Sequence, residues 1–160
     1  RGATPSRPEV PVLYQLSEVE PLLDDGAGLY VRFSAGYAAD VEAGSVDAES
    51  GLPLPGLAAH PLDPEPWWTL PRAEWIARQL TRLPAPRHAP VDGARQERFA
   101  WLLRGRRAGT GPEGEALVAD VEVVGRLAEC LIEQADRVWG ARFDAELGRR
   151  EAEQVAVAHA

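Results

Sequence analysis

The chain has 160 residues, enough for one compact domain, and its 25 acidic against 17 basic side chains give a formal net charge of −8 at pH 7. This charge argues against general binding to nucleic acids or anionic membranes, because both need a net attraction to phosphate. The single cysteine excludes an internal disulfide framework and fits a reducing compartment. With no apolar run of membrane-spanning length and no signal-peptide core, the sequence predicts a cytoplasmic protein.

The N-terminal region has the composition of a flexible tail that leads into a single domain. Residues 1–12 hold three prolines and few apolar side chains, so they are expected to lack fixed structure. The domain itself is predicted to cover 13–147. Ser17 and Glu20 have the spacing of a capping box, which predicts that a short helix begins here.

The clearest strand pattern lies at 28–34, where apolar side chains alternate with others. A period of two residues is typical of a β-strand that has one face on the core. The core face would carry Leu29, Val31 and Phe33, and the opposite face would carry Tyr30, Arg32 and Ser34.

The next segment has little regular pattern before residue 72. Residues 36–51 are acidic and carry few large apolar side chains, which predicts a long exposed loop. Residues 52–58 contain prolines, which donate no ladder hydrogen bond, so this run is expected only as an extended edge. Helical spacing of the apolar side chains predicts a helix over 72–83, which Pro84 ends.

The C-terminal half completes the pattern of elements. Strands are predicted at 99–105 and 116–124, and a broad apolar stripe predicts a long helix over 122–139. Residues 148–160 are expected to form a frayed tail. The sequence therefore predicts an α+β fold in which two main helices cover one face of a small, largely antiparallel sheet.

The first candidate binding site is the strand face that carries Tyr30, Arg32 and Ser34. An arginine guanidinium binds a carboxylate or a phosphate through two parallel hydrogen bonds, so Arg32 is a candidate anion ligand. Two simpler interpretations stay open: this face is solvated, or Arg32 pairs with an acidic side chain of the fold itself.

The second candidate is the glycine-rich segment between the last two predicted strands. Gly109 and Gly111 would let backbone amides approach a ligand, and Glu113 and Glu115 would supply carboxylates two residues apart. A plain hairpin loop also needs glycines. The segment lacks the spacing of the known phosphate-binding loops, so the sequence does not support nucleotide binding by those modes.

The middle of the chain is basic and contains a tryptophan pair. Residues 61–110 hold nine arginines against five acidic side chains, so this region could meet an anion. Trp67 and Trp68 could stack on a flat ligand, although an adjacent tryptophan pair before a helix also serves to close a core.

The remaining chemistry-bearing residues point to no site. Cys130 lies beside Leu131 on the predicted apolar stripe, which predicts a buried thiol. His60, His88 and His159 share no metal-ligand spacing, and one cysteine supplies no zinc set. No metal site is predicted.

Four segments of the chain resemble an actinobacterial family, the domain of unknown function 6098. They read GLYVRFSAG at 28–36, SGLPLPGLAAHPLDPEPWW at 50–68, WIARQL at 75–80 and AWLLRGRRAGTGPEGEALV at 100–118. The last segment departs from the family's usual GRGPDNEPLV, because this chain has GTGPEGEALV. An actinobacterial source also fits a chain in which arginine replaces lysine throughout. The resemblance indicates which proteins are related to this chain, but it implies no function.

Two functions follow from these candidates. The first is a ligand-binding or protein-interaction domain without a cofactor, whose groove lies near Arg32, the Trp67–Trp68 pair and the 109–115 loop. The alternative is an ADP-ribosyltransferase-like enzyme that uses NAD. The resemblance of this chain to such enzymes implies that Arg32 would hold the NAD phosphates and that Glu115 would stabilise the developing oxocarbenium charge. Either function expects Arg32 and Glu115 to converge on one cleft; the substrate, the partner and the oligomeric state stay open.

Overall fold

The computed structural model describes residues 10–83 and 97–158 and confirms the α+β class. The strands are β1 (Val12–Leu13), β2 (Leu29–Ser34), β3 (Leu57–Pro61), β4 (Phe99–Thr110) and β5 (Ala116–Leu127). The helices are α1 (Leu16–Val19), the 3₁₀ helix η1 (Glu20–Asp25), α2 (Tyr37–Ala43), α3 (Arg72–Thr81) and α4 (Glu129–Ala158). The predicted tail at 1–12 lies mostly outside the described residues, and so do His88 and His159.

Four of the strands close on themselves. β2 pairs antiparallel with β3 and β4, and β5 pairs antiparallel with the same two strands. Each of these four strands therefore has a hydrogen-bonded neighbour on both sides, so the sheet forms a small barrel. The short β1 joins β5 in parallel. The predicted edge at 52–58 is wrong, because the paired part begins at Leu57, after the prolines, and lies between two strands.

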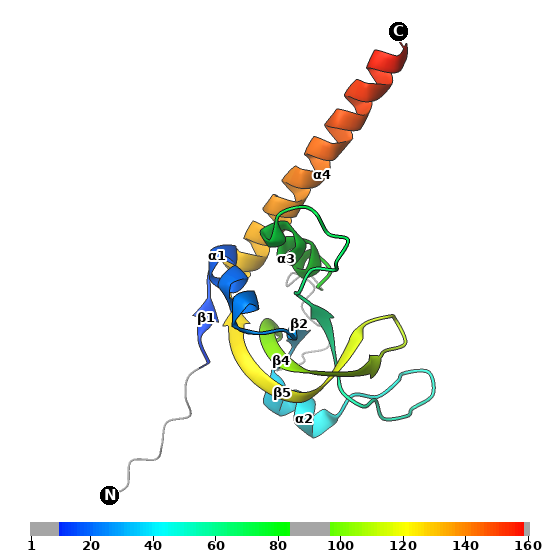
Figure 1. The fold of residues 1–160 in the computed structure, drawn as a ribbon. Coiled ribbons are helices and arrows are strands. Elements are labelled where there is room, and N and C mark those ends of the chain that lie inside the picture. Colours follow the sequence, from blue (N-terminus) through cyan, green and yellow to red (C-terminus); the bar gives the residue numbers. More distant parts are fainter. Residues whose placement is uncertain (1–9, 84–96, 159–160) are drawn as a thin grey trace, which may run out of the picture.

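The barrel closes because β4 and β5 are long and curved (Figure 1). Each has 12 residues, and their mutual register shifts at three places along the hairpin. Such bulges bend a strand and increase its twist. The segment before β3 also comes very close to β5, because a Cβ on Gly56 would lie 2.6 Å from the carbonyl oxygen of Val118. Only glycine fits at that crossing.

Two apolar cores lie on the two sides of the strands. The first lies between the strands and the helices and includes Leu29, Val31, Ile76, Leu102 and Leu131. The second consists of side chains from the four barrel strands and includes Tyr30, Leu57, Trp101, Leu103 and Val118. Because successive residues of a strand point to opposite faces, β2 and β4 supply both cores at once. Both faces of the strand at 28–34 are therefore covered, where the sequence predicts one.

The helices α1, α3 and α4 pack together on the outer face of the barrel (Figure 1). The predicted helix over 122–139 is wrong at its start, because β5 continues to Leu127 and α4 begins at Glu129. The apolar stripe itself is real. Val124 and Leu127 reach the first core from the end of a strand, and Leu131 and Ala135 reach it from the helix that follows.

The helix α4 runs on to Ala158, through residues that the sequence expects to fray, and projects beyond the rest of the molecule (Figure 1). From Leu147 to Ala158 all its side chains are exposed. No helix in the described part of the chain is long and apolar enough to cross a membrane. The domain end predicted near residue 147 stays a prediction.

Three local expectations need correction. The predicted exposed loop at 36–51 contains the helix α2, which Gly36 and Gly44 bound with positive φ values of 108° and 68°. The helix α1 has Gln15 at its N-cap and no side-chain cap, so the capping box predicted at Ser17 does not form although the short helix does. Cys130 is exposed, so the predicted buried thiol is wrong: the side of α4 that faces the first core carries Leu131, Ala135 and Val138, and Cys130 lies off that side.

Candidate functional site

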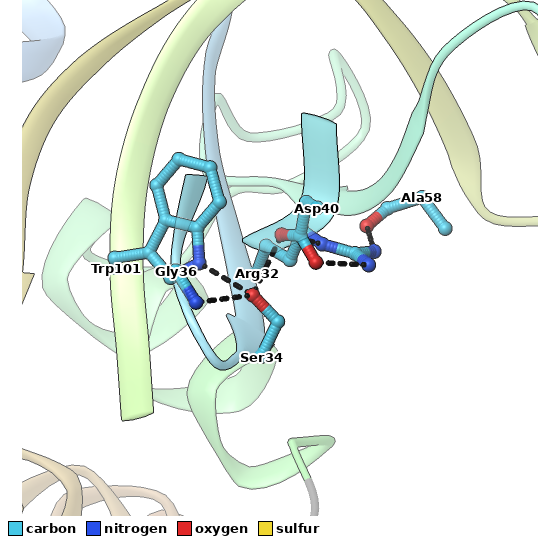
Figure 2. A network of polar contacts seen from close by, with 6 residues as sticks. All are labelled: Arg32, Ser34, Gly36, Asp40, Ala58 and Trp101. Atoms are coloured by element: carbon cyan, nitrogen blue, oxygen red, sulfur yellow. Dashed lines mark hydrogen bonds and ion pairs between the residues drawn. The ribbon is translucent and has the colours of Figure 1, made fainter. Parts of the chain in front are cut away.

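Arg32 of β2 is held by α2 and β3 (Figure 2). Its Nε donates to Asp40 Oδ2 at 2.8 Å, its Nη2 donates to Asp40 Oδ1 at 3.3 Å, and its Nη1 donates to the Ala58 carbonyl oxygen at 2.7 Å. The Arg32 and Asp40 side chains are 19% and 11% exposed. Arg32 therefore pairs with an acidic side chain of the fold itself, which is one of the two simpler interpretations of the sequence.

Ser34 lies next to this pair, and its hydroxyl both donates and accepts hydrogen bonds (Figure 2). The hydroxyl donates to Asp40 Oδ2 at 2.7 Å and accepts hydrogen bonds from Trp101 Nε1 at 3.0 Å and from the Gly36 amide at 3.1 Å. Ser34 is buried, and so is Tyr30, which packs inside the barrel. Nothing in the position of these two side chains supports the predicted contact with a ligand.

The glycine-rich segment forms the tight turn between β4 and β5. The Gly111 amide donates to the Glu115 carbonyl oxygen at 2.8 Å, and the Gly114 amide donates to the Gly111 carbonyl oxygen at 3.0 Å. The Glu115 carboxylate folds back over the turn and accepts from the Glu113 amide at 2.9 Å. A Cβ on Gly111 would collide with that carboxylate. Gly109 lies in β4 opposite Leu117. The glycines therefore serve a hairpin, as the plainer interpretation has it.

Two cavities share Glu115 as part of their lining. The first, of about 590 Å³, is lined by Arg32 and by the carboxylates of Asp47, Glu49, Glu113 and Glu115. We call it the acidic cavity. The second, of about 460 Å³, lies toward α3 and is lined by Trp67 and three arginines. We call it the arginine cavity. Arg32 and Glu115 thus line one cavity, and Trp67 and Glu115 line its neighbour; their roles in binding stay predictions.

Several elements contribute to the arginine cavity. β3 supplies His60, α3 supplies Trp75, Arg78 and Gln79, and Arg82 follows directly after α3. The remaining walls come from Trp67 and Glu65 on one side and from Arg107 of β4 and the β4–β5 turn on the other. Residues from three separate parts of the sequence therefore meet around one opening.

The arginines of this cavity lack acidic partners. Among the residues that the structure describes, none of Arg78, Arg82 and Arg107 forms an ion pair, whereas Arg32, Arg72, Arg106, Arg126 and Arg142 each form at least one. Arg107 donates only to the Thr110 hydroxyl, at 3.1 Å. Burial and then the charge of Arg82 lower the pKa of both His60 and Arg78, while Glu115 opposes the effect at His60. The lining therefore holds three arginines without an ion pair against two carboxylates, Glu65 and Glu115, and carries an excess of positive charge.

A tryptophan cluster surrounds Arg78. The Arg78 Cζ lies between 5.3 and 5.9 Å from the ring centroids of Trp67, Trp68, Trp75 and Trp139. A guanidinium at this distance is attracted to the face of an indole ring. Trp68 also donates from Nε1 to the Pro71 carbonyl oxygen at 3.2 Å and is half-buried, while Trp67 is 63% exposed. The two predicted roles of the tryptophan pair are therefore divided: Trp68 packs and Trp67 faces solvent.

Two residues in the cavity wall carry unsatisfied polar atoms. Trp75 Nε1 and Gln79 Oε1 are buried and have no hydrogen-bond partner in the described parts of the chain. The Gln79 amide nitrogen donates to the Pro61 carbonyl oxygen at 2.8 Å, so the side chain is fixed while its oxygen stays unpartnered. Buried polar groups of this kind are uncommon and costly in folded proteins.

Sequence reasoning found Trp67 and Glu115 but missed Arg78, Arg82 and Arg107 as a group. A usable signal was present, because Trp75, Arg78 and Arg82 follow one another at spacings of three and four residues, which places them on one side of a helix. Arg107 gave no comparable signal, since only the pairing of β4 with β5 brings it near α3.

Neither a search for metal ligands nor comparisons with known proteins assign a function to the chain. Among residues 10–83 and 97–158, no group of three or more His, Cys, Asp or Glu side chains is arranged to hold a metal ion. No curated protein and no solved structure matches the chain. The model of one family, described as a family of unknown function, matches residues 6–150. Because this match covers most of the sequence, the chain belongs to the DUF6098 family.

Proposed function

We propose that this domain binds a small anionic ligand in the arginine cavity. The observation that carries the proposal is that Arg78, Arg82 and Arg107 line one cavity and have no ion-pair partner among the described residues. In a molecule with a net charge of −8, acidic partners for three arginines would be easy to supply. Unpaired arginines in a shared cavity are instead the usual means of binding a carboxylate or a phosphate.

The size and the walls of the cavity support a small ligand. A volume of about 460 Å³ falls within the range of small-molecule pockets. Two residues of the same wall, Trp75 and Gln79, also carry a polar atom without a hydrogen-bond partner among the described residues; both atoms are buried, so a ligand would reach them only if the wall shifted. A ligand that reached these atoms would remove the cost of leaving them unsatisfied.

This proposal keeps part of the groove that the sequence predicts. Trp67 and Glu115 remain in it, while Arg32, bound to Asp40 and to the Ala58 carbonyl, gives way to the three unpaired arginines. The ADP-ribosyltransferase alternative needs Arg32 to hold the phosphates of NAD. Since that guanidinium already has its partners, no observation favours the enzyme, and we do not propose it.

The proposal is tested by isothermal titration calorimetry with two simple anions, pyrophosphate and citrate. Either or both should bind, and Arg82→Ala and Arg107→Ala should each weaken the binding at least about tenfold, because each removes a charged donor. Both side chains are exposed, so these variants should fold normally.

The matched control is Arg137→Ala. Arg137 is an exposed arginine of α4 that has no ion pair within the described residues and does not line the cavity. It should bind both probes as the unaltered protein does. Absence of binding at millimolar probe, or an equal loss in Arg137→Ala, would remove the basis of the proposal.

Two predictions from composition accompany the proposal. The single cysteine supports a cytoplasmic protein, and the acidic charge supports one that does not bind nucleic acid. Localisation of a fluorescent fusion in the source cell, and gel-shift assays with DNA and RNA, would test them.

A further inference from the structure

We infer that the ligand of the arginine cavity carries a flat ring next to its anionic group, and that the ring stacks on Trp67. This inference rests on the proposed anion site and names the class of molecule that the site would take: a planar aromatic or heteroaromatic phosphate or carboxylate. The step beyond anion binding comes from the position and the surroundings of Trp67.

Trp67 is a large apolar side chain left open beside a charged cavity. It is 63% exposed and lines the cavity together with the arginines. Its contacts with Trp68 and Trp75 are edge-on, with interplanar angles of 67° and 77°. Neither neighbouring ring therefore stacks flat on it, and the exposed part of the indole stays available to a flat partner.

The ring is also held in place before any ligand arrives. Trp67 lies within a turn that is closed by the Trp68 amide, which donates to the Glu65 carbonyl oxygen at 2.9 Å, and Pro66 restricts the backbone directly before it. On the side-chain end, the Arg78 guanidinium lies 5.8 Å from the ring centroid. A stacking surface that is fixed in advance loses little conformational entropy on binding.

Arg78 connects the ring to the anion site. It lines the cavity and lies against all four rings of the tryptophan cluster, so the charge and the indole are parts of one packed unit. Arg82 and Arg107, which are not engaged by this cluster, remain for the anionic group itself. A ligand with a ring and an anion would contact both parts at once, whereas an anion alone would leave Trp67 exposed.

The experiment compares pairs of anions in which only one member carries a flat ring. AMP is measured against ribose 5-phosphate, and benzoate against cyclohexanecarboxylate, by calorimetry and by the NMR shift of the Trp67 indole N–H. The ring-bearing member of at least one pair should bind roughly tenfold tighter or more, since stacking of a base on an aromatic side chain has an effect of this size. The phosphate pair and the carboxylate pair separate the two possible sources of the charge.

Variants separate the ring from the charge. Trp67→Ala should reduce the affinity for the probe with the flat ring to that of its partner without one, and leave the affinity for that partner unchanged. The control is Phe143→Ala, which removes another exposed aromatic side chain, on α4 and away from the cavity, and should change neither affinity.

The two proposals fail in different ways. Equal binding of the anions with and without a flat ring, with no effect of Trp67→Ala, would overturn the inference about the ring and leave the anion site standing. If adenosine binds as tightly as AMP, or if Arg82→Ala leaves every affinity unchanged, the anion site itself is wrong, and the inference falls with it.

Discussion

Ser34 connects three parts of the chain through one hydroxyl. Its oxygen is the only hydrogen-bond partner recorded for the buried Trp101 Nε1 within the described residues, and it also anchors the Gly36 amide and the Asp40 carboxylate (Figure 2). Since Asp40 in turn holds Arg32, this hydroxyl helps to fix α2 to the barrel. The network therefore belongs to the stability of the fold.

We expect Ser34→Ala to lower the free energy of unfolding by about 1–3 kcal/mol, because it leaves the buried Trp101 N–H without an acceptor. Urea denaturation followed by tryptophan fluorescence measures the change. The control is Ser17→Ala, whose side chain is exposed and caps no helix, and whose effect should stay within about 0.5 kcal/mol. Equal effects of the two substitutions would contradict this role of Ser34.

His60 makes stability depend on pH. Burial and Arg82 lower its pKa below the usual 6.5 in the folded protein, so the unfolded chain binds more protons when the pH falls below that value. Stability should therefore be fully present above about pH 7 and decrease as the pH falls from there toward the lowered pKa.

This contribution is measured as the difference between the unaltered protein and His60→Gln. The difference in free energy of unfolding should become less favourable to the unaltered protein between pH 7 and pH 5, and stay constant above pH 7. A constant difference over the whole range would show that the His60 pKa is not lowered by folding.

The sequence alone could identify some of these side chains and not others. Trp67 and Glu115 were predictable because a tryptophan pair and a glycine-rich turn are local patterns. The partner of Arg32 was not, because Asp40 lies in a segment that its composition assigns to an exposed loop. The three cavity arginines come together only through the pairing of distant elements.

At the level of strands and helices, local patterns predicted types better than boundaries. The strand at 28–34 and the helix from residue 72 are confirmed, because each has one clear period. The junction of β5 and α4 was mispredicted because Val124 and Leu127 of the strand and Leu131 of the helix contact the same core. Because the apolar residues of the strand and of the helix follow one another without a break, the sequence does not show where the strand spacing ends and the helical spacing begins.

Closure of the barrel depends on glycine where the chain before β3 crosses β5. A Cβ on Gly56 would lie 2.6 Å from the Val118 carbonyl oxygen and 2.7 Å from its amide nitrogen, so backbone would have to move. We expect Gly56→Ala to destabilise the protein by about 1–3 kcal/mol, the usual cost of overpacking. Thermal and urea denaturation measure the loss.

The control for this prediction is Gly109→Ala in β4. Its added Cβ would lie 3.9 Å from Leu117 and Pro55 side-chain carbons, which is ordinary van der Waals contact. The φ of Gly109 is not positive, so alanine can adopt the same backbone conformation without strain. If Gly56→Ala is as mild as Gly109→Ala, the crossing at Val118 is looser than the structure has it.

The whole molecule combines a closed barrel with one long projecting helix. The sequence predicts a small, largely antiparallel sheet with an edge at 52–58 and gives no sign of closure. Closure requires β4 and β5 to pair with each other and with two further strands, and no local pattern reports such distant pairings. The cavity arginines also depend on this folding: in a chain with a net charge of −8, three arginines that form no ion pair with any described residue come together at one cavity.

The projecting part of α4 offers a test of where the domain ends. Val138 and Trp139 pack against the first core, and Arg142 pairs with Glu74 at 2.9 Å. Beyond Leu147 every described side chain is exposed, and the ion pairs of Arg149 and Arg150 are made with Glu146 of the same helix. The helix beyond Leu147 therefore has no described contact with the barrel.

Removal of residues 148–160 should leave the melting temperature and the urea midpoint unchanged within error, because a helix end without tertiary contacts contributes little to global stability. Helical content by far-ultraviolet circular dichroism should fall in proportion to the residues lost. A longer deletion that starts at Val138 is the matched comparison, and it should lower the melting temperature clearly, since it removes Val138 and Trp139 from the core and the Arg142 partner of Glu74. Anion binding in the arginine cavity should survive the short deletion, because no lining residue lies beyond Ala116. A large loss of stability on removing residues 148–160 would place the domain end beyond Leu147.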